Sequence, residues 1–215
     1  MEPDAVEIRV AACLVEKQRT TPDAYPLSLN ALRLACNQST NRDPVVAYDE
    51  ETVSAALRRL AQRGWTRLAS GAGSRARKYR HLLPEALGVD DEELALLAVL
   101  MLRGAQTPGE LKQRSERLHA FADLGTVQTA LERLLEREVV VRHPRRPGQK
   151  EDRFEQVLGG GEGEAPDDGE PQEEESEPAF LSPAVAADDE RLARLEGELQ
   201  DLRAEVAKLR ESLGG

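Results

Sequence analysis

The sequence DEETVSAALRRLAQR at residues 49–63 returns as DLGTVQTALERLLER at residues 123–137. Eight of the fifteen aligned positions are identical, where unrelated sequence would give about one. A leading Asp, the apolar positions of a helix and two Arg recur together, which indicates a duplicated structural unit. The identities are Asp49/Asp123, Thr52/Thr126, Val53/Val127, Ala56/Ala130, Leu57/Leu131, Arg59/Arg133, Leu60/Leu134 and Arg63/Arg137.

The residues around the first copy predict three helices followed by a β-hairpin. Helices are expected over residues 5–17, from Ser28 as N-cap, and from Asp49 as N-cap to Gly64. The stretches WTRLA (65–69) and RARKYRHL (75–82) read as strands joined by the glycine-rich turn SGAGS (70–74). This order is typical of a winged helix.

The second copy repeats the order after the connector LPEALGV (83–89). Asp90 and Glu93 predict a capping box before the apolar helix LALLAVLMLRG (94–104), and Thr107 with Pro108 predicts the start of a short helix. The strands are EVVVRH (138–143) and EDRFEQVL (151–158), joined by PRRPGQK (144–150). The predicted fold class is mainly α with small β-hairpins (α+β), with winged-helix domains at 1–83 and 84–158.

The C-terminal part predicts two further segments. Residues 159–189 form an acidic linker expected to be disordered, because 159–179 hold nine acidic and no basic residues. Residues 190–213 predict a coiled-coil helix whose opposite g and e charges favour a parallel homodimer; the alternative is an amphipathic helix that folds back onto its own domains. The heptad seam consists of Leu192, Leu195, Leu199, Leu202, Val206, Leu209 and Leu213.

Charge and composition narrow the class of protein. The net charge is −11, but residues 1–158 carry 24 basic against 23 acidic residues, and the tail 5 against 17. The near-neutral body therefore leaves nucleic-acid binding open. The sequence shows no secretory signal, and its longest apolar run, nine residues from Leu94, is too short for a membrane span. Cys13 and Cys36 are expected to be buried thiols in a cytoplasmic protein, with a redox pair as the alternative.

No catalytic or metal-binding constellation is recognised, and no cofactor is expected. His81, His119 and His143 are scattered without a second ligand at metal-site spacing. GAGSRA (71–76) imitates half of a dinucleotide fingerprint, but it lies between two strands instead of opening a helix. The sequence is therefore interpreted as that of a non-enzyme.

The basic and polar side chains on the third helix and on the two hairpins are suited to binding double-stranded DNA. A winged helix usually lays its third helix in the major groove and its hairpin along phosphates. Arg can read guanine and Gln can read adenine. The candidate DNA-binding residues are Ser54, Arg58, Arg59 and Gln62 on the third helix, Arg67, Arg75, Arg77, Lys78 and Arg80 on the first hairpin, and Arg142, Arg145, Arg146, Lys150 and Arg153 on the second.

Acidic residues on the equivalent helix of the second copy argue against DNA binding. Glu132 and Glu136 stand in the second copy where the first has Arg58 and Gln62, so the first module is expected to contribute more to DNA binding. The alternative function is a scaffold that binds a protein partner through its winged helices. The polar stretch 37–44 is expected to satisfy its own loop backbone, or else to form a contact surface between the modules or for a partner.

Four stretches carry a family resemblance: TTPDAYPLSLNALRLACNQSTNRDP (20–44), RGWTRLASGAGSRARKY (63–79), LRGAQTPGEL (102–111) and RRPGQKEDRF (145–154). The chain resembles the YceH family of uncharacterised bacterial proteins over residues 5–158, and loosely beyond. The resemblance implies tandem winged-helix domains and no established activity or site residues. The chain differs from the family mainly in its long acidic linker.

Overall fold

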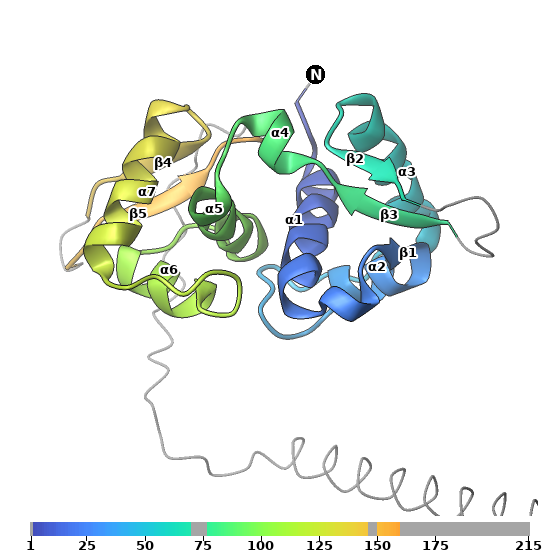
Figure 1. Ribbon diagram of the computed structural model, residues 1–215, viewed down its shortest axis with the longest axis horizontal. Coiled ribbons are helices and arrows are strands. Elements are labelled where there is room, and N and C mark those ends of the chain that lie inside the picture. Colours follow the sequence, from blue (N-terminus) through green and yellow to red (C-terminus); the bar gives the residue numbers. More distant parts are fainter. Residues whose placement is uncertain (1, 70–76, 146–149, 160–215) are drawn as a thin grey trace, which may run out of the picture. The chain divides into compact units, whose positions relative to one another are not determined.

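The computed structural model describes residues 2–69, 77–145 and 150–159 (Figure 1). The first module contains α1 (Ala5–Thr20), the 3-10 turn η1 (Pro22–Ala24), β1 (Leu27–Ser28), α2 (Leu29–Cys36), α3 (Glu50–Gln62), β2 (Thr66–Leu68) and β3 (Lys78–His81). After α4 (Leu83–Leu87), the second module contains α5 (Asp91–Arg103), α6 (Pro108–Ser115), α7 (Leu124–Glu136), β4 (Val140–His143) and β5 (Arg153–Gln156). The mainly helical α+β fold class is confirmed, and three helices followed by a hairpin occur twice.

Side-chain caps start the helices where the sequence predicts them. The Asp49 carboxylate accepts the backbone N–H of Thr52 at 2.8 Å, and the Asp123 carboxylate accepts that of Thr126 at 2.8 Å. Each cap satisfies a donor that the first helical turn would leave unpaired, which stabilises a helix by about 1 kcal/mol. The two copies of the repeat therefore begin in the same register.

The small sheets repeat as well. The order in the first module is β1-β3-β2, all antiparallel, with Leu27 of β1 opposite Tyr79 of β3. In the second module β4 pairs with β5, and Gln106 forms an isolated bridge to Phe154 of β5. Leu27 and Gln106 each immediately precede the N-cap residue of the following helix. The duplication thus includes a third strand position, which the sequence patterns did not predict.

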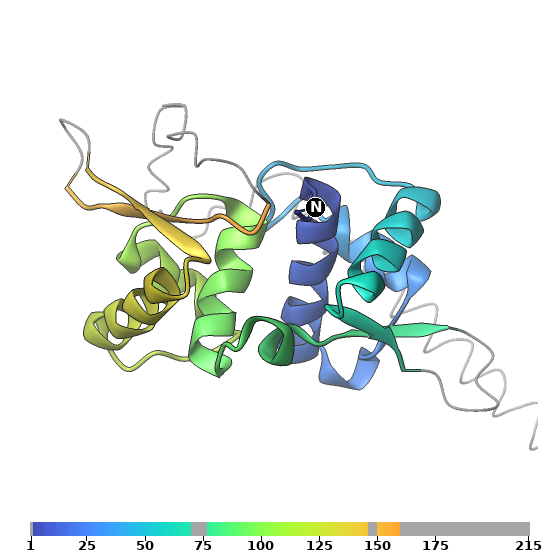
Figure 2. The same cartoon turned by 90° about the horizontal axis from the view of Figure 1, so that it is seen from above.

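Two helices form the centre of the folded part. α1 and α5 lie side by side in both views (Figures 1 and 2), and both are buried along most of their length. Such burial fits helices that are apolar on several faces. Their residues belong to one continuous hydrophobic core that includes both modules. Residue 83, the predicted domain boundary, is itself buried at the start of α4.

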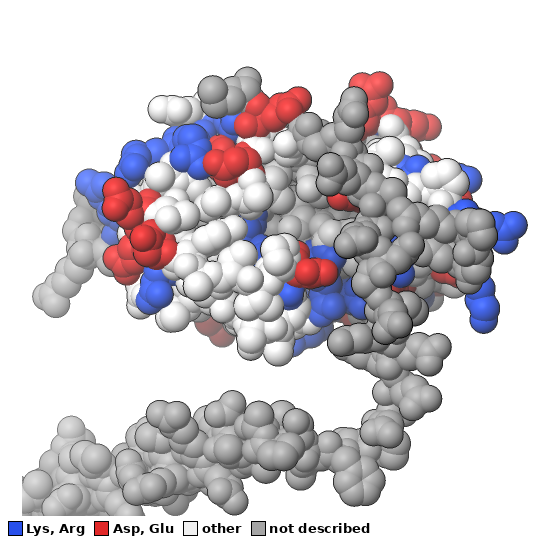
Figure 3. Space-filling view, turned by 180° about the vertical axis from the view of Figure 1, so that it is seen from behind, with Lys and Arg blue, Asp and Glu red and all other residues white. Residues whose placement is uncertain are grey.

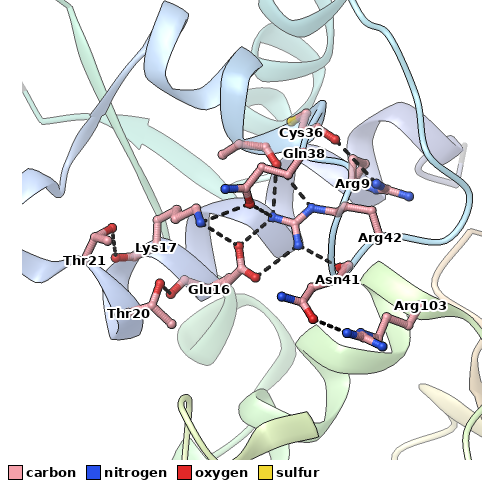
Figure 4. A network of polar contacts seen from close by, with 11 residues as sticks. Arg9, Glu16, Lys17, Thr20, Thr21, Cys36, Gln38, Asn41, Arg42 and Arg103 are labelled. Carbon is pink, nitrogen blue, oxygen red and sulfur yellow. Dashed lines mark hydrogen bonds and ion pairs between the residues drawn. The ribbon is translucent and has the colours of Figure 1, made fainter. Parts of the chain in front are cut away.

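The polar stretch at 37–44 serves both purposes that its sequence suggested. Within the first module, Asn37 donates to the carbonyl of Tyr48 and accepts the N–H of Tyr48, each at 2.8 Å. Toward the second module, the N–H of Asp43 donates to the carbonyl of Leu102 at 2.8 Å, and Asn41 hydrogen-bonds Arg103 (Figure 4). The stretch satisfies its own backbone and joins the modules.

Arg42 holds this loop from inside the protein (Figure 4). Its side chain has no exposed surface and pairs with Glu16 of α1 at 2.6 and 3.0 Å. The guanidinium also donates to the carbonyls of Ala35 and Asn41 and to the Gln38 side chain. A planar five-donor group suits such a site because all its donors can be used at once. Arg42 is the structural centre of the loop.

The acidic linker 159–189, beyond Gly159, and the coiled-coil helix 190–213 lie outside the described residues. They remain predictions from the sequence.

Candidate nucleic-acid interface

The third helix of the first module separates a buried face from an exposed one. Val53, Ala56, Leu57 and Leu60 are buried at helical spacing. Ser54 is half-buried, whereas Arg58 and Gln62 are exposed on the outer side, as the sequence predicts. The guanidinium of Arg58 donates to the Ser54 hydroxyl at 3.2 Å, which orients it along the helix. These side chains form one continuous polar strip.

Arg59, another candidate for DNA, points instead toward the start of α1. It pairs with Asp4 at 2.5 Å and Glu7 at 3.1 Å, and Arg63 also pairs with Glu7 at 3.1 Å. Asp4 and Glu7 form a capping box that the sequence patterns did not predict. Arg59 therefore belongs to an internal ion-pair network that ties α3 to α1.

The second module contains the same network. Arg133 pairs with Asp90 at 3.1 Å, Glu92 at 2.9 Å and Glu93 at 3.3 Å, and Arg137 pairs with Glu93 at 3.2 Å. Glu93 is fully buried, as is its counterpart in the first module. The two Arg that recur in both copies of the repeat are thus explained by structure.

The outer face of α3 and the first hairpin enclose a groove of about 200 Å³. Leu57 and Ala61 of α3 and Leu68 and Tyr79 of the hairpin give it an apolar floor. Leu68 leaves 54% of its surface exposed, so part of this apolar lining is open to solvent. The remaining lining residues are Ser54, Arg58, Thr66, Arg67 and Arg77.

The three Arg of this groove form no ion pair with any acidic side chain in the described part of the chain. Arg58 makes the single contact to Ser54, and Arg67 and Arg77 are exposed without an acidic partner there. On the face shown in Figure 3, acidic and basic side chains are interspersed around a broad uncharged area. A guanidinium that lacks an internal partner can donate hydrogen bonds to a carboxylate or a phosphate of a bound ligand.

The hairpin places one further Arg beside Arg67. Arg67 of β2 lies directly opposite Arg80 of β3, so both side chains project from the same face. Like charges at directly opposite positions destabilise a hairpin unless an anion lies between or beside them. The Nε atom of Arg80 is buried and has no hydrogen-bond partner. Lys78 lies in the same strand, opposite Ser28, and Arg75 is outside the described residues.

The candidate residues of the second module are arranged differently. Arg142 pairs with Asp152 at 2.7 Å, and Arg153 pairs with Glu110 at 3.0 Å and donates to the carbonyl of Ala105. Their charges are therefore largely compensated within the protein. Arg145 and Lys150 are exposed, and Arg146 lies outside the described residues.

The helix of the second module carries the opposite charge. Glu132 and Glu136 of α7 are exposed at the positions equivalent to Arg58 and Gln62. The basic surface of the structure therefore lies mainly on the first module, and no equivalent strip exists on α7.

His81 does not contribute to this surface. Its ring is buried, with the two nitrogens bonded to Gln18 at 2.6 Å and to the N–H of Leu83 at 3.4 Å. Burial lowers the pKa of His81 to about 4, so the ring is neutral near pH 7. Because Nδ1 accepts from Leu83, Nε2 carries the proton and donates to Gln18.

Cys13 and Cys36 are buried free thiols, as predicted. The hydrogen bond between them, together with burial, raises the pKa of Cys36 above its ordinary value. In the part of the chain that the structure describes, no three His, Cys, Asp or Glu side chains are placed to hold a metal ion. Nor does any described helix have the length and apolar character needed to cross a membrane.

Comparison with known proteins gives a consistent result. Residues 4–149 match the family model described as "Protein of unknown function, DUF480". The chain belongs to this family. Among its relatives, the UPF0502 protein of Pelobacter propionicus is 47% identical over 206 residues, covering 95% of this chain and 91% of the relative. The UPF0502 protein of Geobacter metallireducens is 48% identical over 198 residues, covering 91% and 88%.

A third UPF0502 relative, from Solibacter usitatus, is 44% identical over 209 residues, which is 97% of each chain. An alignment of that extent necessarily includes residues of the tail beyond the second module. Membership of the DUF480/UPF0502 family agrees with the resemblance found in the sequence. The names of these relatives state no ligand and no activity.

Proposed function

We propose that the two modules are tandem winged helices and that this DUF480 family member is a dimeric protein that binds double-stranded DNA, as a transcriptional regulator or architectural factor. The observation that carries the proposal is the arginine-lined face formed by α3 and the first hairpin. Arg58, Arg67 and Arg77 lie on it without acidic partners among the described residues, and Arg80 lies directly opposite Arg67 on the hairpin.

The positions of these residues fit the usual contacts of a winged helix with DNA, in which the third helix meets base edges and the hairpin meets phosphates. Arg58 and Gln62 are one turn apart on the outside of α3, where they can reach base edges. Arg67 and Arg80 share one face of the adjacent hairpin, where they can contact phosphates. We assign the larger share of binding to the first module, because Glu132 and Glu136 would repel DNA in the second.

Dimerisation is part of the proposal. The predicted heptad seam, Leu192 to Leu213, would join two chains in parallel. Two linked copies of a weakly binding face raise the effective affinity for one long duplex, provided that both can reach it.

The test is fluorescence anisotropy with a labelled duplex of random sequence, using the full chain at about 50 and 150 mM salt. We expect salt-dependent binding. The combined variant Arg58→Ala, Arg67→Ala, Arg77→Ala should weaken it at least about tenfold at low salt and reduce the slope of log K against log salt by about 2 to 3.

Two controls separate a local effect from a general loss of charge. Arg117→Ala removes one exposed positive charge outside the proposed face and should change affinity little. Arg142→Ala, Arg145→Ala, Lys150→Ala removes the same number of charges from the second hairpin and should weaken binding less than the first-module variant. Equal affinity of the first-module variant and the unmodified chain would refute the proposal.

The apolar floor of the groove favours one second candidate, a protein-interaction scaffold. Leu68 and Tyr79 offer a docking surface that phosphate binding does not require. In that case nuclease-treated lysate should yield a stoichiometric partner that the Leu68→Ser variant no longer retains. Recovery only of partners that depend on nucleic acid would count against the scaffold.

A further inference from the structure

We propose that the groove of the first module is occupied by a segment of the chain's own tail, residues 173–182 with the sequence EEESEPAFLS. The groove combines an apolar floor with three Arg at its sides. A ligand for such a surface needs an apolar anchor next to several acidic groups, and this segment has both. That the tail competes with DNA rests on the proposed function; its docking in the groove does not.

Phe180 supplies the anchor. The chain has three phenylalanines, and the other two, Phe121 and Phe154, are buried in the core. Phe180 and Leu181 follow an acidic run with four Glu between residues 173 and 177, from which Pro178 and Ala179 separate them. An aromatic ring on Leu68 and Tyr79, which both keep exposed surface, would remove apolar surface of both partners from water.

Charge complementarity selects this segment over a neutral one. The tail after Leu158 has a net charge of −12, from 5 basic and 17 acidic residues. Arg58, Arg67 and Arg77 have no acidic partner among the described residues, so glutamates beside Phe180 can pair with them. The second module lacks this match, because Glu132 and Glu136 occupy the same side of α7.

The place where the tail leaves the folded part brings it close to α3. Gly159 lies near the start of α1: a Cβ placed on it would be 3.3 Å from the carbonyl oxygen of Pro3 and 3.8 Å from Cγ1 of Ile8. The same end of α1 is held by α3, since Arg63 donates to the carbonyl of Glu2 at 2.8 Å and pairs with Glu7. The tail therefore begins beside the helix that forms one wall of the groove.

The linker is long enough for the remaining distance. Residues 160–179 separate Gly159 from Phe180, and about 20 residues can span at most roughly 70 Å. α3 has 13 residues and is about 20 Å long. A tether of this kind gives an effective concentration on the order of millimolar, so even a weak contact is populated.

The test places a photo-crosslinking analogue of phenylalanine, p-benzoyl-phenylalanine, at position 180 of the full chain. After irradiation, mass spectrometry should locate crosslinks on α3 and the first hairpin, around Leu57, Ala61, Leu68 and Tyr79. The matched control carries the same probe at Ala193, in the predicted coiled-coil helix, and should not give this pattern. Crosslinks from position 180 spread over the whole surface, or concentrated on the second hairpin, would overturn the proposal.

A charge exchange tests the chemistry of the contact. Arg58→Glu with Arg77→Glu should reduce the crosslinking yield several-fold, and Glu173→Arg, Glu174→Arg, Glu175→Arg in the same chain should restore it. Both Arg are on the surface, and circular dichroism checks that the variant is folded. Failure of the second set to restore the yield would refute charge pairing at this site.

Two further measurements distinguish docking of the tail in the groove from DNA binding. A mixture of isotopically heavy and light chains should give crosslinked peptides of one label only; mixed labels would refute an intramolecular contact. If the tail competes with DNA, Phe180→Ala should raise the affinity of the full chain for a duplex several-fold. If the chain binds no DNA, the crosslinks alone decide the docking proposal.

Discussion

Replacing Arg42 with Met should destabilise the protein by about 3 to 5 kcal/mol, the range measured when one partner of a buried ion pair is removed. The Arg42 side chain is fully buried, and its loss leaves the Glu16 carboxylate, only 13% exposed, without its bidentate partner. The carbonyl of Ala35 also loses two hydrogen bonds, and each buried acceptor left unsatisfied costs about 1 to 3 kcal/mol. Lys17, 3.2 Å from Glu16, still pairs with this carboxylate in the variant, so we expect a loss of stability near the lower end of this range.

Urea denaturation followed by Trp65 fluorescence and by far-ultraviolet circular dichroism measures this change. The control Arg58→Met removes an exposed Arg and should stay within about 0.5 kcal/mol of the unmodified protein. The double variant Arg42→Met, Glu16→Met should recover part of the loss, because it leaves no buried charge unpaired. A loss below about 1 kcal/mol for Arg42→Met would show that water or Lys17 replaces the guanidinium, and the reasoning would fail.

The remaining predictions concern other buried polar groups. The folded-state pKa of His81, about 4, lies below its unfolded value of about 6.5. The neutral buried ring therefore contributes fully to the free energy of unfolding above pH 6.5. This contribution declines as pH falls from 6.5 to 4, by up to about 1.4 kcal/mol per pH unit. Denaturation of His81→Gln at several pH values should lack this slope, and an unchanged slope would contradict the assignment. Burial alone would raise the pKa of Glu16, but the hydrogen bonds and charge of Arg42 outweigh it and hold this pKa below its usual range. Its stabilising contribution is thus present above about pH 4.5 and lost as pH falls through the lower folded-state pKa, which carbon-detected NMR titration of Glu16 can check. Asn37→Ala removes two hydrogen bonds to Tyr48 and should cost about 2 kcal/mol in thermal or urea unfolding, against less than about 0.5 for Asn30→Ala on the surface of α2. Glu7→Gln and Glu93→Gln should destabilise by similar amounts, about 1 to 3 kcal/mol, because each loses ion pairs with two Arg; a large effect of only one would argue against equivalent networks.

Local sequence signals predicted most of the helical framework. Asp49, Asp90 and Thr107 begin their helices through side-chain hydrogen bonds to nearby backbone groups, and such contacts span only three residues. Periodic apolar residues likewise placed the buried face of α3. The order of helices and hairpins followed from these signals, together with the glycine-rich turn.

Contacts between distant residues could not be predicted in this way. Arg59 has the same sequence context as Arg58, but one helical step turns it toward Asp4, 55 residues away. The pairing of Arg142 with Asp152 depends on the register of the second hairpin, and the pairing of Arg153 with Glu110 depends on how this hairpin packs against α6. Similarly, nothing local marks Arg42 as a buried residue, because its partner Glu16 lies on another helix.

The packing of α1 against α5 brings together equivalent helices of the two modules. The two helices occupy the same position in their modules, each beginning with an Asp and Glu capping box. Arg19 near the end of α1 contacts Asp91 at the start of α5, so the helices run in opposite directions. Antiparallel packing of equivalent elements on each other is what a two-fold, isologous association of identical subunits produces. The folded body is thus organised as a fused homodimer of single modules would be, with two halves whose third helices differ in charge.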